Sequence, residues 1–175
     1  METIWTIGHS THSLEKFLAM LASQEICALA DVRQFPGSRR FPHFGKEALA
    51  VSLKNAGVRY EHSIELGGRR TARPDSRNNA WRNAAFRGYA DYMETAEFRA
   101  GIERLCGLAR EVRTAIMCSE AVWWRCHRGL ISDFLKVRGW EVIHIFSATK
   151  TEPHPFTSAA QILDGELSYA GLAGL

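Results

Sequence analysis

The sequence predicts a single α/β domain over residues 1–175, with a mostly parallel sheet of about five strands and flanking helices in Rossmann-like layers. Short apolar runs rich in branched side chains alternate with segments whose apolar residues recur at helical spacing. At 175 residues, of which 46% are hydrophobic, the chain suits one domain with a substantial core. It contains no internal repeat and no low-complexity stretch that would divide it.

Five apolar runs are the predicted strands. Helix-like segments of about a dozen residues separate most of them, and this alternation indicates βαβ units with parallel pairing. The predicted strands cover residues 3–8, 26–32, 58–63, 114–120 and 140–146.

Four segments have the apolar spacing of helices. Ser13 is the predicted N-cap of the first helix, and Gly57 is the expected C-cap of the second. The third segment is expected to break into two pieces near Thr95, and Gly139 closes the last. The predicted helices cover residues 14–24, 46–57, 88–112 and 126–139.

Two parts of the chain lack a clear pattern. Residues 69–87 are predicted to form a long basic loop, because six arginines fall in this polar stretch. Loops of this length are uncommon in compact domains and are often functional. The tail from about residue 147 is expected to be irregular, apart from a short strand pair around Asp164 and Gly165.

Chemically interesting residues lie where the predicted strands end. His9 follows the first strand, Asp31 and Arg33 end the second, and Cys118 and Glu120 end the fourth. In open α/β sheets the ligand crevice lies beyond the carboxyl ends of the strands, so we expect these side chains to share one crevice. The expected catalytic residues are Glu120, Cys118, Asp31 and His9.

These candidates are compatible with two kinds of chemistry. Asp31 and Glu120 would act as general acid and base or stabilise a cationic transition state, although Asp31 also suits a structural ion pair with Arg33 or Arg128. Cys118, between a strand end and a helix start, would be a nucleophilic or redox thiol. Alternatively, Cys118 is a buried thiol that packs beneath the loop after its strand.

No cofactor is expected, but zinc bound through Cys118, Cys126 and His127 is an alternative. The paired knuckle spacing that is typical of zinc sites is missing. The histidines considered for a fourth ligand are His9, His12 and His43. The remaining cysteines, Cys27 and Cys106, lie in strand-like and helix-like runs and are expected in the core.

Arginines and aromatic residues interleave at residues 35–44 and 81–89, and two tryptophans precede Cys126. Arginine suits phosphate, and ring faces stack on bases, so this composition indicates a nucleic-acid or nucleotide partner. The other interpretation is that the rings belong to the core and the arginines cover them. The expected substrate-binding residues are Arg33, Arg39, Arg40, Arg69, Arg87, Tyr89, Trp123, Trp124, His127 and Arg128.

Several classes of protein are disfavoured. No apolar run approaches the roughly 20 residues that span a bilayer. The N-terminus also lacks a signal-peptide pattern, so a cytoplasmic protein without a membrane partner is expected. Without a Walker or G-x-G-x-x-G motif, nucleoside triphosphates and dinucleotides are disfavoured. Gly67 and Gly68, ahead of Arg69, would form an anion-binding nest or a plain tight turn.

Short motifs are spread over nearly the whole chain: TIGHST at 6–11, DVR at 31–33, FPGSRR at 35–40, LGG at 66–68, FRGYADYM at 86–93, CSE at 118–120, CHR at 126–128, HPFT at 154–157 and LDG at 163–165. Together they resemble the family called domain of unknown function 488. The resemblance implies a small bacterial or archaeal α/β domain and supports the chosen site residues, but it supplies no reaction. The stretch AVWWR at 121–125 departs from the more polar linker expected of the family.

Three functions are compatible with these residues. The favoured hypothesis is a glycosylase-like hydrolase that acts on nucleic acid or a nucleotide, with Glu120 or Asp31 at a base or N-glycosidic bond, as in repair or processing. The second is a thiol enzyme that transfers sulfur or phosphoryl groups through Cys118, although six residues rather than the usual five separate it from Arg125. The third is a non-catalytic module that binds nucleic acid.

Overall fold

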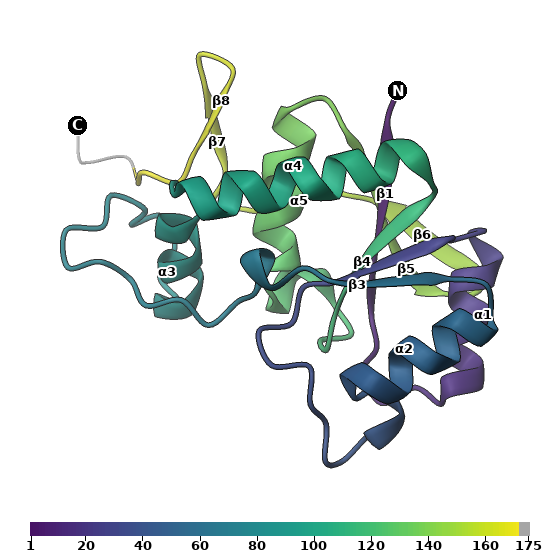
Figure 1. Ribbon diagram of the computed structural model, residues 1–175. Coiled ribbons are helices and arrows are strands. Elements are labelled where there is room, and N and C mark those ends of the chain that lie inside the picture. Colours follow the sequence, from purple (N-terminus) through teal and green to yellow (C-terminus); the bar gives the residue numbers. More distant parts are fainter. Residues whose placement is uncertain (172–175) are drawn as a thin grey trace.

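A six-stranded sheet with the order β3-β2-β4-β1-β5-β6 forms the centre of the computed structural model, which describes residues 1–171 (Figure 1). The first five strands pair in parallel, and β6 is antiparallel to β5. A separate hairpin pairs β7 with β8. The strands are β1 (Thr3–Gly8), β2 (Ala28–Asp31), β3 (Arg59–His62), β4 (Thr114–Cys118), β5 (Glu141–Ser147), β6 (Lys150–Pro153), β7 (Gln161–Leu163) and β8 (Glu166–Ser168).

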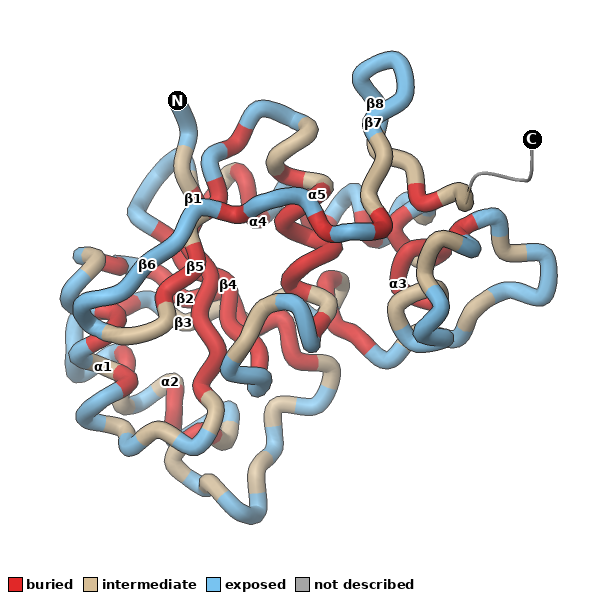
Figure 2. The backbone as a smooth tube through the Cα atoms, turned by 180° about the vertical axis from the view of Figure 1, so that it is seen from behind, coloured by how far each residue is buried: buried red, intermediate tan, exposed pale blue. Residues whose placement is uncertain are grey.

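Helices cover both faces of the sheet (Figure 1). On β4, Ala115 and Met117 belong to the core cluster that includes residues of α1 and α2, whereas Ile116 and Cys118 belong to the cluster on the α4 and α5 side. This alternation gives the central strands two buried faces, which Figure 2 shows as continuous buried backbone through the centre. The helices are α1 (Leu14–Ser23), α2 (Lys46–Asn55), α3 (Ala84–Tyr92), α4 (Ala96–Glu111) and α5 (Arg128–Val137).

The predicted fold class is confirmed, and the predicted elements differ from the observed ones mainly at their edges. Ser13 accepts a hydrogen bond from Lys16 N as the N-cap of α1. Thr95 separates α3 from α4 and caps α4 by accepting from Phe98 N. The strand pair expected around Asp164 is β7 and β8. The prediction missed β6, because its KTEP sequence is polar and exposed and has no strand pattern.

The long loop ends earlier than predicted, because α3 already begins at Ala84. Its first part is fixed by Asp91 of α3, whose carboxylate accepts hydrogen bonds from Arg73 N, the Ser76 hydroxyl and the Asn78 amide at 2.6–2.7 Å. The loop is therefore held against the domain by buried polar contacts, although it contains no strand or helix. Within residues 1–171, no helix has the length and apolar character needed to cross a bilayer.

Candidate active site

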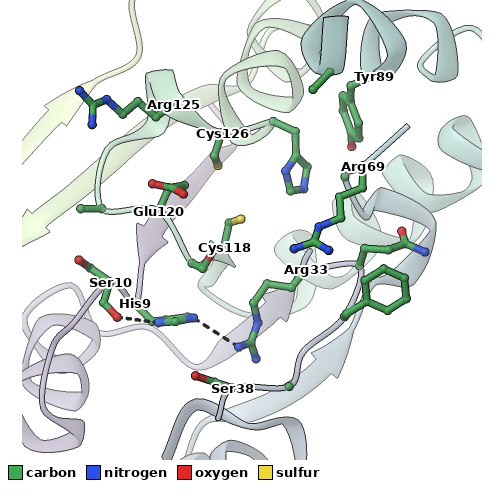
Figure 3. A pocket seen from close by; sticks show the side chains of 18 of the residues that line it. His9, Ser10, Arg33, Ser38, Arg69, Tyr89, Cys118, Glu120, Arg125 and Cys126 are labelled. Carbon is green, nitrogen blue, oxygen red and sulfur yellow. Dashed lines mark hydrogen bonds between the residues drawn. The ribbon is translucent and has the colours of Figure 1, made fainter. Parts of the chain in front are cut away.

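A cavity of about 600 Å³ opens at the carboxyl ends of β1, β2 and β4 (Figure 3). The structure brings together there most of the side chains that the ends of these strands suggested. His9 lies beyond β1, Arg33 beyond β2, and Cys118 and Glu120 at the end of β4. The other walls come from distant segments. They include Phe35, Phe41, Gly68, Arg69, Phe86, Tyr89, Arg125, Cys126 and His127.

Two cysteines and one histidine meet on one side of this cavity. The sulfur atoms of Cys118 and Cys126 and a ring nitrogen of His127 all lie within 4.8 Å of one another. Both cysteines are reduced and buried. The Nε2 of His127 lies 2.8 Å from the carbonyl oxygen of Val32, which can only accept, so Nε2 carries the proton. A side chain at Gly68 would lie 2.9 Å from Nδ1 of the same ring, so this glycine permits the close packing.

Arg128 fixes the electrostatic state of Cys126. Its backbone N–H and its Nε lie 3.3 and 3.2 Å from the Cys126 sulfur. Its remaining nitrogens donate to the carbonyl oxygen of Glu120 and to the hydroxyl of Thr6. Arg128 is 1% exposed, and no carboxylate among the described residues forms an ion pair with it. A buried guanidinium needs a counter-charge, and the Cys126 sulfur is the contacting atom that can supply one as a thiolate.

The two thiols consequently differ in acidity. Burial raises the pKa of Cys126, but the hydrogen bond from Cys118 and the charge and N–H groups of Arg128 outweigh it and lower this pKa to about 6. The hydrogen bond to Cys126 and burial raise the pKa of Cys118 to about 12. Cys126, at the start of α5, is therefore the anionic member of the pair.

Arg33 is held rigidly at the opposite side of the cavity. Its Nε and Nη2 donate to the two carboxylate oxygens of Asp31 at 2.9 and 2.7 Å. Tyr60 also donates to this carboxylate at 2.6 Å. The Nη1 of Arg33 lies 3.3 Å from Nε2 of His9, whose Nδ1 donates to the carbonyl oxygen of Ser10. His9 is thus neutral, and burial is the main cause that lowers its pKa to about 4.

Positive charge dominates the mouth of the cavity. Figure 3 shows the side chain of Arg69 extending toward the space in front of Cys118, and the guanidinium of Arg33 beside His9, whereas Arg125 points away. Arg69 adopts a left-handed backbone conformation (φ 59°) and lies over the Phe35 ring at 5.6 Å. Such φ values are uncommon outside glycine and cluster at functional sites. The acidic side chain on the wall is Glu120, which is exposed.

Asp31 and Arg128, two of the predicted site residues, are buried behind the cavity wall and do not line it. Asp31 is fully buried and is absent from the described cavity wall, because its carboxylate is taken up by Arg33 and Tyr60. This is the structural ion pair that was the alternative for Asp31, and it orients Arg33. Arg128 also lies below the surface, since Cys126, Thr6 and Glu120 hold its guanidinium. Neither residue is placed to contact a substrate directly.

Several predicted substrate-binding residues lie outside the cavity as the described residues define it. Arg39 and Arg40 are exposed, and Arg87 is half-buried on α3. Trp123 stacks on His144 with the ring centres 4.9 Å apart, so it belongs to the supporting structure. The half-exposed Trp124 lines a neighbouring smaller hollow, which also touches Cys126. Its aromatic walls are Trp81, Phe86, Trp123, Trp124 and Phe156.

The zinc alternative required Cys118, Cys126 and His127 to converge, and the structure brings them together. Within residues 1–171, no fourth histidine, cysteine or acidic ligand joins this cluster. His9 is engaged by Arg33 and Ser10, and His43 contacts the carbonyl oxygen of His12. The adjacent guanidinium of Arg128 would also repel a divalent cation. The three residues are able to hold a metal, against the positive charge of Arg128 beside them.

Sequence reasoning gave Cys126 a part only in the zinc alternative, although it has the stronger signal of activation. A cysteine directly before a helix start and two residues before an arginine is a pattern that predicts a lowered thiol pKa. From the sequence, a substrate-binding role is predicted for its neighbours His127 and Arg128 only. Cys27, expected in the core, is exposed at the opposite end of β2, whereas Cys106 is buried as expected.

A model of the family described as Domain of unknown function DUF488 matches residues 13–135. The matched segment is more than two thirds of the chain and contains Arg33, both cavity cysteines, His127 and Arg128. Comparisons with curated proteins and with solved structures give no match.

Proposed function

Because this chain belongs to the Domain of unknown function DUF488 family, its reaction has to be inferred from its own residues, and we propose that it is a thiol-dependent enzyme. Its nucleophile is the Cys126 thiolate, and its substrate is a small anionic compound with an electrophilic sulfur atom. The contact between the Cys126 sulfur and the buried Arg128 guanidinium carries this proposal. A thiolate, not a thiol, is the attacking species, and Arg128 would hold Cys126 in that form near neutral pH.

Anion recognition is the second part of the proposal. Asp31 and His9 orient the Arg33 guanidinium, and Arg69 reaches toward the same space (Figure 3). Planar guanidinium groups suit carboxylate, sulfonate and phosphate groups of a substrate. The Asp31 and His9 contacts limit the motion of Arg33, so little conformational entropy is lost when it binds an anion.

Sulfur chemistry is favoured over phosphoryl transfer by the place of Cys126 in the chain. Loops that bind phosphate direct several backbone N–H groups toward the anion. No such loop follows Cys126, because α5 begins at Arg128. The N–H group of Arg128 itself donates to the Cys126 sulfur.

Site-resolved alkylation tests the proposal. In a Cys27→Ser background, reaction of Cys126 with iodoacetamide should titrate with a midpoint near the pKa of about 6, well below that of an ordinary thiol. Arg128→Met should raise this midpoint by removing the counterion, and Arg128→Lys should raise it less. The readout is peptide mass spectrometry across a pH series, with thermal melting as a check of folding. An ordinary midpoint for Cys126 in the parent protein would refute the proposal.

A second comparison isolates anion recognition. Iodoacetate carries a charge that iodoacetamide lacks, so its rate at Cys126, relative to iodoacetamide, should exceed the same ratio for a free thiol. Arg69→Gln should lower this ratio, whereas Arg77→Gln should not, because Arg77 is an exposed loop arginine outside the described cavity wall. Equal ratios in both variants would remove Arg69 from the proposed binding site.

A nucleotide or single-stranded nucleic acid is the second candidate substrate. The aromatic hollow beside Cys126 and the arginine-lined cavity together offer ring faces and anion-binding groups. In this version Glu120 would act on the base or glycosidic bond without Asp31. Binding of fluorescent oligonucleotides that weakens steeply with salt, and base release that is lost in Glu120→Gln, would support it. No binding at low salt would exclude it.

A further inference from the structure

The cavity contains a second thiol, Cys118, which the proposed nucleophilic step does not use. It ends β4, and its sulfur lies within 4.8 Å of the Cys126 sulfur and of a His127 ring nitrogen. Cys118 and Cys126 both line the cavity, so both are accessible from the same space. The other two cysteines lie elsewhere, with Cys27 at the opposite end of the sheet and Cys106 inside α4.

His127 is oriented to act on Cys118. Its Nε2–H donates to the carbonyl oxygen of Val32 at 2.8 Å, which orients the ring and leaves Nδ1 as the nitrogen that carries the lone pair in the neutral form. Because Nε2 is occupied, Nδ1 is the ring nitrogen that can accept a proton from a thiol. Cys126 already has a cation beside it and needs no base, whereas Cys118 lacks a cationic neighbour of that kind among the hydrogen bonds of residues 1–171.

From this arrangement we infer that Cys118 is a resolving thiol and that the two cysteines form a redox-active dithiol that reduces a low-mass anionic disulfide. This inference rests on the proposed role of Cys126 as nucleophile. To that role it adds a two-electron reduction. The substrate is a disulfide R–S–S–R whose R groups carry carboxylates. The carboxylates would bind at Arg33 and Arg69.

The reaction has two exchange steps. First, the Cys126 thiolate attacks one sulfur of the disulfide, the S–S bond breaks, and one R–S⁻ leaves while Cys126–S–S–R forms. Then Cys118 loses its proton to Nδ1 of His127 and attacks the Cys126 sulfur, which releases the second R–S⁻ and forms a Cys118–Cys126 disulfide. The substrate gains two electrons, and the dithiol loses them.

Arg128 stabilises the reduced form of the pair, so the disulfides that the pair reduces are those more oxidising than a Cys118–Cys126 disulfide. When Cys126 enters a disulfide its negative charge is lost, and the buried guanidinium is left without that counterion. A dithiol whose thiolate form is stabilised gives a disulfide that is readily reduced again. The pair would therefore return to the dithiol with an external thiol such as glutathione.

Stoichiometry of reaction with 5,5′-dithiobis(2-nitrobenzoate), an anionic aromatic disulfide, tests the inference. The reference protein in this experiment is the Cys27→Ser variant, because the exposed Cys27 thiol would otherwise react as well. It should release two equivalents of the coloured thiolate per chain and end two hydrogen masses lighter, with no adduct. With Cys118→Ser added, one equivalent should be released and the adduct should remain on Cys126. Cys126→Ser should react far more slowly.

His127→Gln adds a measurement that a purely structural role would not change. The second release should slow by at least about tenfold more than the first, since a general base typically contributes about 10²–10⁴ in rate. It should also rise steadily with pH in this variant, because Cys118, with its pKa of about 12, then has to lose its proton to the solvent. A stable adduct on Cys126 with Cys118 present would overturn the resolving role but leave the nucleophile intact. Slow reaction of Cys126 itself would overturn the proposed function and this inference together.

Discussion

Two buried arginines at the site differ in their counterions. Arg33 has the carboxylate of Asp31, an ordinary ion pair that leaves its charge compensated. Arg128 has the sulfur of Cys126 instead. Breaking a buried pair by removing one partner typically costs about 3–5 kcal/mol, since it leaves a charge without compensation. The charge of Arg33 is therefore balanced by a fixed carboxylate, whereas that of Arg128 depends on the ionised form of Cys126.

His9 predicts a pH dependence of stability. Its pKa is about 4 in the folded protein and 6.5 without burial, so the unfolded chain binds more protons between these values. The free energy of unfolding should therefore fall as the pH falls from 6.5 toward 4, by up to about 3 kcal/mol for this group. Urea titrations should show a shallower fall for His9→Gln than for the parent protein. Parallel curves would contradict the assigned burial of a neutral His9.

Two glycines within helices differ in how closely other parts of the protein approach them. On α3, a Cβ at Gly88 would lie 2.1 Å from the carbonyl oxygen of Arg70, so the helix touches the backbone of the long loop there. A Cβ at Gly107 on α4 would have no atom within 4 Å of it. The two glycines are both helical but differ in what surrounds them.

Substituting each glycine by alanine separates packing from helix propensity. Gly107→Ala should raise the free energy of unfolding by up to about 1 kcal/mol, since alanine is the better helix former. Gly88→Ala should lower it instead, because the loop backbone has to move and its contacts with Asp91 are disturbed. Chemical denaturation measures both effects. Stabilisation by Gly88→Ala would show that α3 and the loop do not pack as described.

Over the whole molecule, a buried network of hydrogen bonds connects the candidate site to the C-terminal segment. Arg128 donates to the Thr6 hydroxyl, which lies 2.6 Å from Nδ1 of His144. The Nε2 of His144 lies 2.8 Å from Nδ1 of His154, whose Nε2 lies 2.8 Å from Asp133. The directions agree if each histidine is neutral and donates through Nε2. This network of hydrogen bonds includes residues of β1, β5 and α5, so it joins parts of the protein that are distant in the sequence.

Asp133 anchors the segment after β6. It is fully buried and accepts hydrogen bonds from His154, from the backbone and hydroxyl of Thr157, and from Tyr169. Asp133→Ala should destabilise the protein by about 3–5 kcal/mol and expose residues 154–169 to proteolysis. Limited proteolysis with mass spectrometry locates the cleavage. Asp75→Ala, at an exposed aspartate, is the matched control and should change neither quantity.

Apart from β6, the order of strands and helices along the chain, and the edge of the sheet at which the polar residues gather, follow from the sequence alone. Apolar periodicity, caps such as Ser13 and the break at Thr95 are local signals, and parallel pairing then places the strand ends together. Only the tertiary structure decided how the site residues pair. Asp31 turned toward Arg33, and Cys126 toward Arg128. Partner choice among buried charged groups depends on side-chain direction and desolvation, and these arise only when distant segments pack against one another.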